Sequence, residues 1–269
     1  MIMSFNRGRA QLRCEEYLKC TGHLEKWNQS DFENFALNKA EANQLTQDLS
    51  EDSVDLYFKG LLSLSEALNS VSKFYYSWAT IKLYYSVYYF IKATLASKGI
   101  ALIRRKALYY LFARDGQKPV KKSPKKYNSD HSGTLHHYQD LFPGDILLSN
   151  NIDDETVYEW LMKRREQIQY RERNFHEPSQ PYFWNYIVKK IEEIGMNTLI
   201  DQYIRDKYLL CFQEEHACMA TPIKRAILTK TDLVNAGIIA NLSDGQRTKI
   251  VDLLIHDGIP LPIIHILGI

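Results

Sequence analysis

The chain has 269 residues, with 34 Lys and Arg against 32 Asp and Glu, so its formal net charge is only +2. This balance excludes a protein that coats nucleic acid indiscriminately, because such proteins are strongly basic overall. The apolar content of 45% and charged content of 25% exclude disorder, and twelve glycines and eight prolines are too few for a sandwich with many tight turns.

Helical patterns dominate the first hundred residues. A capping box of Ser30 and Glu33 predicts a helix over 30–49, and the leucine spacing predicts a second helix over 54–69. An aromatic-rich stretch predicts a third helix over 72–97. Aromatic residues all round a helix indicate that it is packed between other helices, so we expect core there rather than a stacking platform for bases.

Charge is distributed unevenly along the chain. Residues 31–55 carry a net charge of −6, and residues 104–126 carry +8. The basic stretch includes a predicted short helix over 102–114 and a lysine-rich loop over 116–133, which is long for a compact domain. The loop is either a solvated insert, a contact for an acidic partner, or a track for an RNA or DNA backbone. The candidate nucleic-acid-binding residues are Arg104, Arg105, Lys121, Lys122, Lys125 and Lys126.

The remaining elements are also predicted to be helices, and no alternating pattern predicts a sheet. Three carboxylates, Asp153 to Glu155, are expected at the N-terminus of a helix that carries Trp160 and ends ahead of Pro178. Further helices are predicted over 135–141, 182–194 and 199–212, with two or three short ones in 222–269. We therefore expect an N-terminal helical segment (1–53), a helical core (54–200) with a basic insert (116–133), and a C-terminal helical extension (201–269).

Common catalytic and cofactor motifs are absent from the sequence. There is no P-loop, no Gly-x-Gly-x-x-Gly, no Gly-x-Ser-x-Gly and no His-Glu-x-x-His, so no cofactor is expected. Four cysteines without standard zinc spacing are predicted to be free thiols, and no metal is expected. With no signal-peptide pattern and no unbroken run of about 20 apolar residues, we expect a cytoplasmic protein with no membrane contact.

The best chemical candidate is the pair Arg171 and His176. A histidine can move a proton to or from a ribose hydroxyl, and an arginine can hold a phosphate, which together suffice for RNA cleavage without a metal. On a straight helix the two side chains would point about 140° apart. They converge only if the helix ends before His176, which Pro178 favours. The alternative is a basic helix end with a surface histidine.

A longer pattern supports the first interpretation by resemblance. The string Trp78-Ala79-x-x-x-Leu83-Tyr84-Tyr85-Ser86-x-Tyr88-Tyr89-x-x-Lys92-Ala93, a long insert and then Arg171-x-x-x-x-His176 resembles the HEPN family, including its YaaC-like branch. The resemblance covers roughly residues 55–200. It implies an all-α HEPN-like helical bundle, flanked here by the N-terminal segment and the C-terminal extension.

The resemblance also implies a function. In active members the Arg and His form a ribonuclease site across a dimer interface, in toxins or effectors of prokaryotic defence against phage and plasmids. Arg171 would then bind the scissile phosphate and His176 would transfer protons, with Glu172 and Asn174 as polar support. Two alternatives remain: a non-catalytic HEPN-like subunit that holds an ATPase or nuclease in a larger defence complex, and a nucleic-acid sensor that uses the basic loop.

Overall fold

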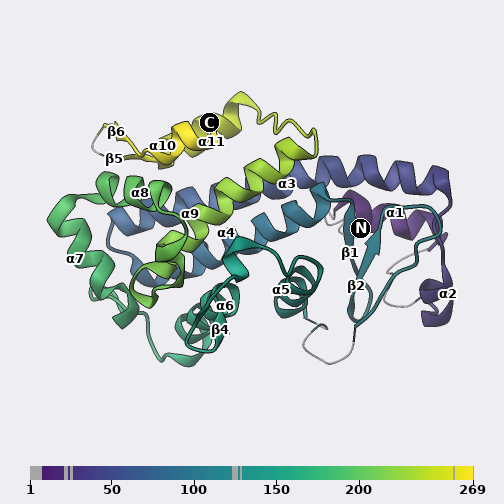
Figure 1. Ribbon diagram of the computed structural model, residues 1–269, viewed down its shortest axis with the longest axis horizontal. Coiled ribbons are helices and arrows are strands. Elements are labelled where there is room, and N and C mark those ends of the chain that lie inside the picture. Colours follow the sequence, from purple (N-terminus) through teal and green to yellow (C-terminus); the bar gives the residue numbers. More distant parts are fainter. Residues whose placement is uncertain are drawn as a thin grey trace, which may run out of the picture. The chain divides into compact units, whose positions relative to one another are not determined.

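The computed structural model describes residues 8–20, 24, 27–122, 127, 129–256 and 258–268 (Figure 1). The regular secondary structure of the described chain is helical apart from three two-stranded antiparallel hairpins, which confirms the predicted all-α class. The helices are α1 (Arg9–Tyr17), α2 (Gln29–Asn34), α3 (Lys39–Ser72), α4 (Tyr76–Ser97), α5 (Asp130–Leu141), α6 (Val157–Glu166), α7 (Asn185–Ile194), α8 (Met196–Arg205), α9 (Glu214–Asn235), α10 (Asp244–Leu253) and α11 (Ile263–Leu267). The hairpins are β1 (Ile100–Arg104) with β2 (Leu108–Phe112), β3 (Asn151–Ile152) with β4 (Glu155–Thr156), and β5 (Ile255–His256) with β6 (Ile259–Pro260).

The chain divides into two compact units, and helices α3, α4 and α9 each contribute residues to both. The first unit takes its described residues from Met1–Leu56, Ile91–Leu141 and Asp232–Ala240. The second unit takes them from Tyr57–Phe90, Phe142–Thr231 and Asn241–Ile269.

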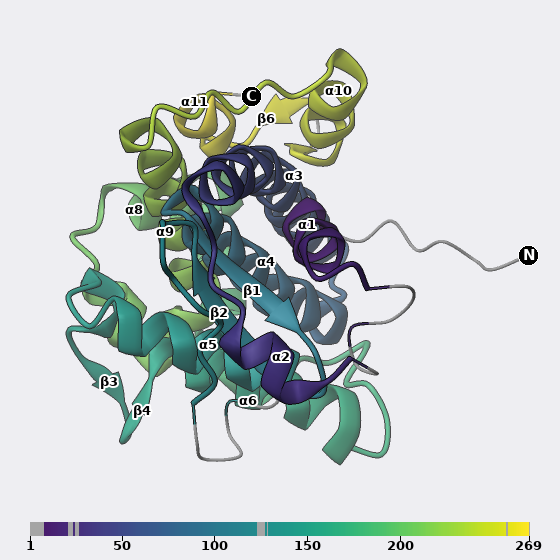
Figure 2. The ribbon, with the colours of Figure 1, turned by 90° about the vertical axis from the view of Figure 1, so that its right-hand side faces the viewer.

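The first unit is built around the β1–β2 hairpin, which Figure 2 shows beside α1. Ala101, Ile103 and Leu111 of the hairpin are buried with side chains from α1, α2 and α3 in one core. The predicted helix over 102–114 is therefore wrong. The error has a physical reason, because a short apolar run rich in aromatic and branched residues fits a strand as well as a helix.

Helix α3 is one 34-residue helix, so the predicted pair of helices over 30–49 and 54–69 is wrong. Its N-terminus is capped by Asn38, whose side chain accepts hydrogen bonds from the Ala40 and Glu41 amides at 2.9 and 3.0 Å. Ser30 lies inside the short helix α2, where Asn28 is the cap instead. The pair that caps α3 is therefore Asn38 and Glu41, eight residues after the predicted pair of Ser30 and Glu33.

Acidic residues in the middle of α3 serve another helix. The Asp52 carboxylate accepts hydrogen bonds from the backbone amides of Arg9 and Ala10, both at 2.9 Å, and so caps α1. Arg13 of α1 binds Asp48 at 2.6 Å. Part of the acidic segment therefore binds the N-terminal helix of the same unit.

The second unit packs helices around the aromatic stretch of α4. Tyr84 and Phe90 are fully buried, as predicted for core, and Trp184 donates its indole N–H to the Thr80 hydroxyl at 2.8 Å. Helix α3 approaches closely at Gly60, where an added Cβ would lie 2.5 Å from the Phe90 ring. A side chain at this position would force the two helices apart.

Other element boundaries differ from the prediction. Asp153 to Glu155 lie in the β3–β4 hairpin, and Thr156 caps α6 in a capping box with Glu159. Helix α8 ends at Arg205, and α9 runs for 22 residues with Pro222 inside it, so residues 222–235 continue a long helix. In the part of the chain that the structure describes, no helix is long and apolar enough to cross a bilayer.

Candidate active site at the end of helix α6

The candidate site lies in the second unit, where α6 changes its winding. The helix continues past Glu166 as a wider π-helical turn, Gln167–Arg171, and the backbone becomes extended at Glu172. Such wide turns are rare and often occur at functional sites. The helix thus ends before His176. The sequence indicated that the Arg171 and His176 side chains can converge only if the helix ends there.

His176 is held by a carboxylate. Its Nε2 lies 2.5 Å from Oε2 of Glu172, and the other carboxylate oxygen accepts a hydrogen bond from the Gln167 side-chain amide at 2.7 Å. The His176 side chain is 33% exposed. Glu172 therefore fixes the orientation of the imidazole while leaving the ring accessible.

The backbone around His176 is anchored to the N-terminus of α4. The His176 amide donates to the Ser77 hydroxyl at 3.1 Å, and the Ser77 amide donates to the Glu177 carboxylate at 2.7 Å. A carboxylate at a helix N-terminus is also favoured by the helix dipole. Two segments about one hundred residues apart in the sequence are joined in this way.

Arg171 is not joined to His176 within one chain. Its side chain is 73% exposed, and its nearest charged partner is Glu166, at 3.7 Å. Among the described residues, no hydrogen bond links the Arg171 guanidinium to the His176 ring. Asn174 is exposed and makes no side-chain hydrogen bond within the described chain. The structure thus brings together Glu172 and His176, whereas Arg171 contacts only Glu166 among the described charged residues and stays largely exposed.

Two neighbouring arginines, Arg164 and Arg165, lie against aromatic rings. Arg165 is buried, with its guanidinium carbon 4.7 Å from the centre of the Tyr84 ring. Burial raises the pKa of Tyr84. Arg164 lies 5.4 Å from the Trp160 ring and donates to the Tyr182 hydroxyl. Helical spacing gave no signal that separates the buried Arg165 and the half-buried Arg164 from the exposed Arg171.

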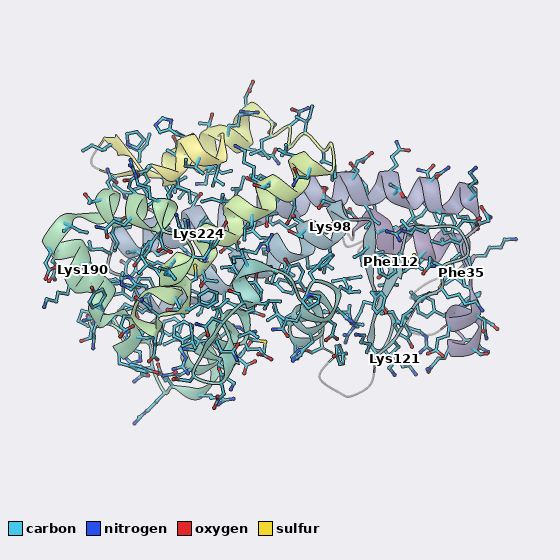
Figure 3. All side chains as sticks on the ribbon, viewed as in Figure 1. Phe35, Lys98, Phe112, Lys121, Lys190 and Lys224 are labelled. Carbon is cyan, nitrogen blue, oxygen red and sulfur yellow. The ribbon has the colours of Figure 1, made fainter. Side chains whose placement is uncertain are left out.

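Four of the six basic residues proposed to bind nucleic acid are described by the structure, in the first unit, and three of these four have internal partners. Arg105 is buried and donates to the Trp27 carbonyl at 2.8 Å, and Lys122 binds Asp140 at 2.8 Å. Lys121 is exposed and makes no ion pair among the described residues (Figure 3). Arg104 lies 3.4 Å from the Asp130 carboxylate, whereas Lys125 and Lys126 lie outside the described residues.

No metal site is formed by the described residues, since nowhere in them do three His, Cys, Asp or Glu side chains gather with metal-binding geometry. Cys14, Cys211 and Cys218 are buried free thiols. Burial raises the pKa of Cys14 to about 12, so this thiol stays protonated at neutral pH.

The HEPN domain family matches residues 53–194, which is 142 of the 269 residues. The chain therefore belongs to the HEPN family, and the resemblance is confirmed. Arg171 and His176 both lie inside the matched range. Comparison with curated proteins gives no significant match, and neither does comparison with solved structures.

Proposed function

We propose that the protein is a metal-independent RNA endonuclease whose site is completed by two copies of the chain, acting as an effector or toxin in prokaryotic defence. The observation that carries the proposal is the imidazole of His176, oriented by Glu172 and still accessible, just beyond the helix turn that presents Arg171. Membership of the HEPN family supports it.

The Glu172–His176 pair sets the chemistry of the ring. Because an ionised carboxylate only accepts hydrogen bonds, its contact with Nε2 places the proton of the neutral ring on Nε2. Nδ1 is then the free acceptor, and it is suited to take the proton from a ribose 2′-hydroxyl. The 2′-oxygen attacks the adjacent phosphorus, the bond to the 5′-oxygen breaks, and that oxygen takes up a proton. The products are a 2′,3′-cyclic phosphate and a 5′-hydroxyl.

Arg171 supplies the positive charge that this reaction needs. A guanidinium that is 73% exposed and 3.7 Å from its nearest carboxylate is available to bind a phosphate. It would stabilise the charge that develops on the phosphoryl oxygens. Since a single chain makes no hydrogen bond between Arg171 and His176, we infer that the arginine of one protomer acts with the histidine of the other. HEPN domains commonly dimerise, which supports this arrangement.

The test is cleavage of RNA in buffer containing EDTA. The wild-type protein should cleave and leave cyclic-phosphate ends, and His176→Ala and Arg171→Ala should each lower the rate by about a hundredfold or more. Matched controls are His265→Ala and Arg205→Ala, which remove an exposed histidine and an exposed arginine elsewhere in the same unit. Expression of the wild type, and not of His176→Ala, should arrest bacterial growth. An unchanged rate for His176→Ala would overturn the proposal.

The second candidate function is a non-catalytic subunit of a multi-protein defence complex with an ATPase or nuclease. It is favoured by exposed apolar side chains near the end of the chain, a feature that often marks a protein interface. Ile255, Ile259 and Ile266 are 41%, 57% and 40% exposed. A wild-type protein that leaves RNA intact and co-purifies stoichiometrically with an ATPase encoded beside it would establish this function instead.

A further inference from the structure

Five large aromatic side chains near the candidate active site face solvent. They belong to the α3–α4 connection, the first turn of α4 and the segment around Arg171, whereas the aromatic residues further along α4 are mostly buried. Large exposed apolar side chains on neighbouring segments often mark a binding site. We call them the aromatic patch: Phe74 (66% exposed), Tyr75 (50%), Trp78 (48%), Tyr170 (67%) and Phe175 (40%).

Contacts in the second unit join the patch to the site. The Trp78 and Phe175 rings are 5.0 Å apart and nearly perpendicular, at 77°. This edge-to-face packing fixes the two rings without stacking one on the other, so flat ring surface stays open. Phe175 directly precedes His176, whose amide binds Ser77, the residue before Trp78. Tyr170 directly precedes Arg171. The patch therefore borders the proposed catalytic residues.

Phe74 is held in a backbone conformation that does not suit it. Its φ is +63°, in the left-handed region, and its amide bonds to the Val71 carbonyl as it ends α3. Glycine is the usual residue at such a helix end, because a bulky side chain is strained there. A strained residue whose ring is 66% exposed gains little from packing, and strain of this kind clusters at binding sites.

The charge around the patch fits a polyanion. Lys73, Arg171 and Arg173 are exposed, and neither Lys73 nor Arg173 makes an ion pair among the described residues. The nearby carboxylates are already bonded, since Glu172 binds His176 and Gln167. Exposed aromatic rings beside exposed cations are the features of single-stranded nucleic-acid sites, where bases stack and phosphates pair with cations.

We propose that the aromatic patch is a stacking subsite for unpaired bases of a single-stranded RNA, next to the phosphate that Arg171 binds. The inference deepens the proposed function by naming the form of the substrate. A base in a duplex is covered by its neighbours and cannot stack on Trp78 or Phe74, so the subsite selects unpaired RNA.

The experiment measures binding in the full-length His176→Ala protein, so that no cleavage intervenes. The probes are a fluorescent single-stranded RNA of about ten nucleotides and an abasic strand of the same length and charge. The protein should prefer the base-bearing strand, and Trp78→Ala should raise its Kd about fivefold or more and remove the preference. Tyr186→Ala is the matched control, because Tyr186 is a 39% exposed aromatic of the same unit that packs on His216. Tyr186→Ala should change neither the Kd for the base-bearing RNA nor the preference for it over the abasic strand.

Phe74→Gly is the sharper variant. Glycine relieves the positive φ, so the free energy of unfolding should stay the same or rise while the Kd for the base-bearing RNA also rises. A structural role for Phe74 predicts lower stability instead.

Each outcome decides. Equal binding of the base-bearing and abasic strands, or a preference that survives both substitutions, overturns the inference. So does a result in which both variants change the oligomeric state, because the patch is then an interface between copies. If the patch binds RNA as expected but the wild type does not cleave it, the subsite stands and the nuclease proposal fails. If the wild type cleaves RNA and Trp78→Ala cleaves it equally well, the nuclease proposal stands and the stacking subsite fails.

Discussion

Two arginine-containing segments that look alike in the sequence differ in how the fold uses them. In the first unit, Arg105 is buried against the Trp27 carbonyl, and Arg104 and Lys122 face carboxylates. In the second unit, Arg171 is 73% exposed and only loosely paired. The comparison teaches that a local excess of positive charge in the sequence does not show which cations are exposed, because Arg105 is buried while Lys121 of the same segment faces solvent.

The same contrast exists within the second unit. Arg225 is 1% exposed and donates to Asp145, itself 6% exposed, at 2.9 Å. Asp145 also accepts a hydrogen bond from the Tyr158 hydroxyl at 2.9 Å. A guanidinium in this environment holds the fold together and has no donor to offer a ligand.

The largest effect on stability is expected at this buried pair. Arg225→Met leaves the Asp145 charge buried and uncompensated, so the free energy of unfolding should fall by about 3–5 kcal/mol. Chemical denaturation monitored by circular dichroism measures the change. Arg205→Met, at an exposed arginine of the same unit, is the control and should change stability by less than about 0.5 kcal/mol. Equal effects of the two substitutions would contradict the distinction drawn here.

A smaller effect is expected at Arg105. Arg105→Ala removes the donors to the Trp27 carbonyl and the Gln29 side chain, and should lower the free energy of unfolding by about 2 kcal/mol. Arg171→Ala should change it by less than about 0.5 kcal/mol. In the RNA cleavage assay the order reverses, with the larger loss at Arg171. An Arg105→Ala protein of wild-type stability would show that the first unit's cations are as free as those of the second.

The histidines extend the comparison to pH. His137, in the first unit, is buried between Tyr110 and Tyr127, and burial lowers its pKa to about 4. The unfolded chain takes up a proton at this residue below its ordinary pKa of 6.5, and the folded chain does so only near 4. The contribution of His137 to the free energy of unfolding is therefore constant above pH 6.5 and falls as the pH drops from 6.5 toward 4.

His137→Phe should flatten this part of the stability–pH curve, measured by urea unfolding between pH 7 and pH 5. His265→Phe, at an exposed histidine, is the control and should leave the curve unchanged. A wild-type slope in the His137→Phe protein would show that other groups cause the acid sensitivity.

Much of the helical fold was predictable, because helical spacing in α4 and a glycine stop at Gly99 are local signals. The errors came from long-range interactions. The cap of α1 could not be read from the sequence, because Asp52 and its hydrogen-bond partners in α1 are more than forty residues apart. The β1–β2 hairpin has a turn without glycine or asparagine, so no turn signal marked it.

The geometry of the candidate site could not be predicted from the sequence. The sequence indicated Arg171 and His176, but the π-helical turn, the Glu172 contact and the anchor at Ser77 depend on packing between α4 and α6. Which aromatic residues of the α4 pattern remain exposed was likewise set by tertiary packing, since Trp78 and Tyr84 belong to one helical pattern and only Trp78 faces solvent.

The most direct test of the central claim, a site shared by two copies, is a mixing experiment. The Arg171→Ala and His176→Ala proteins are each expected to be inactive. When they are co-folded at equal amounts, half of the dimers are mixed, and each mixed dimer contains one intact pair of Arg171 and His176. RNA cleavage should then recover to about a quarter of the wild-type rate. A mixture as inactive as its two components would contradict a shared site.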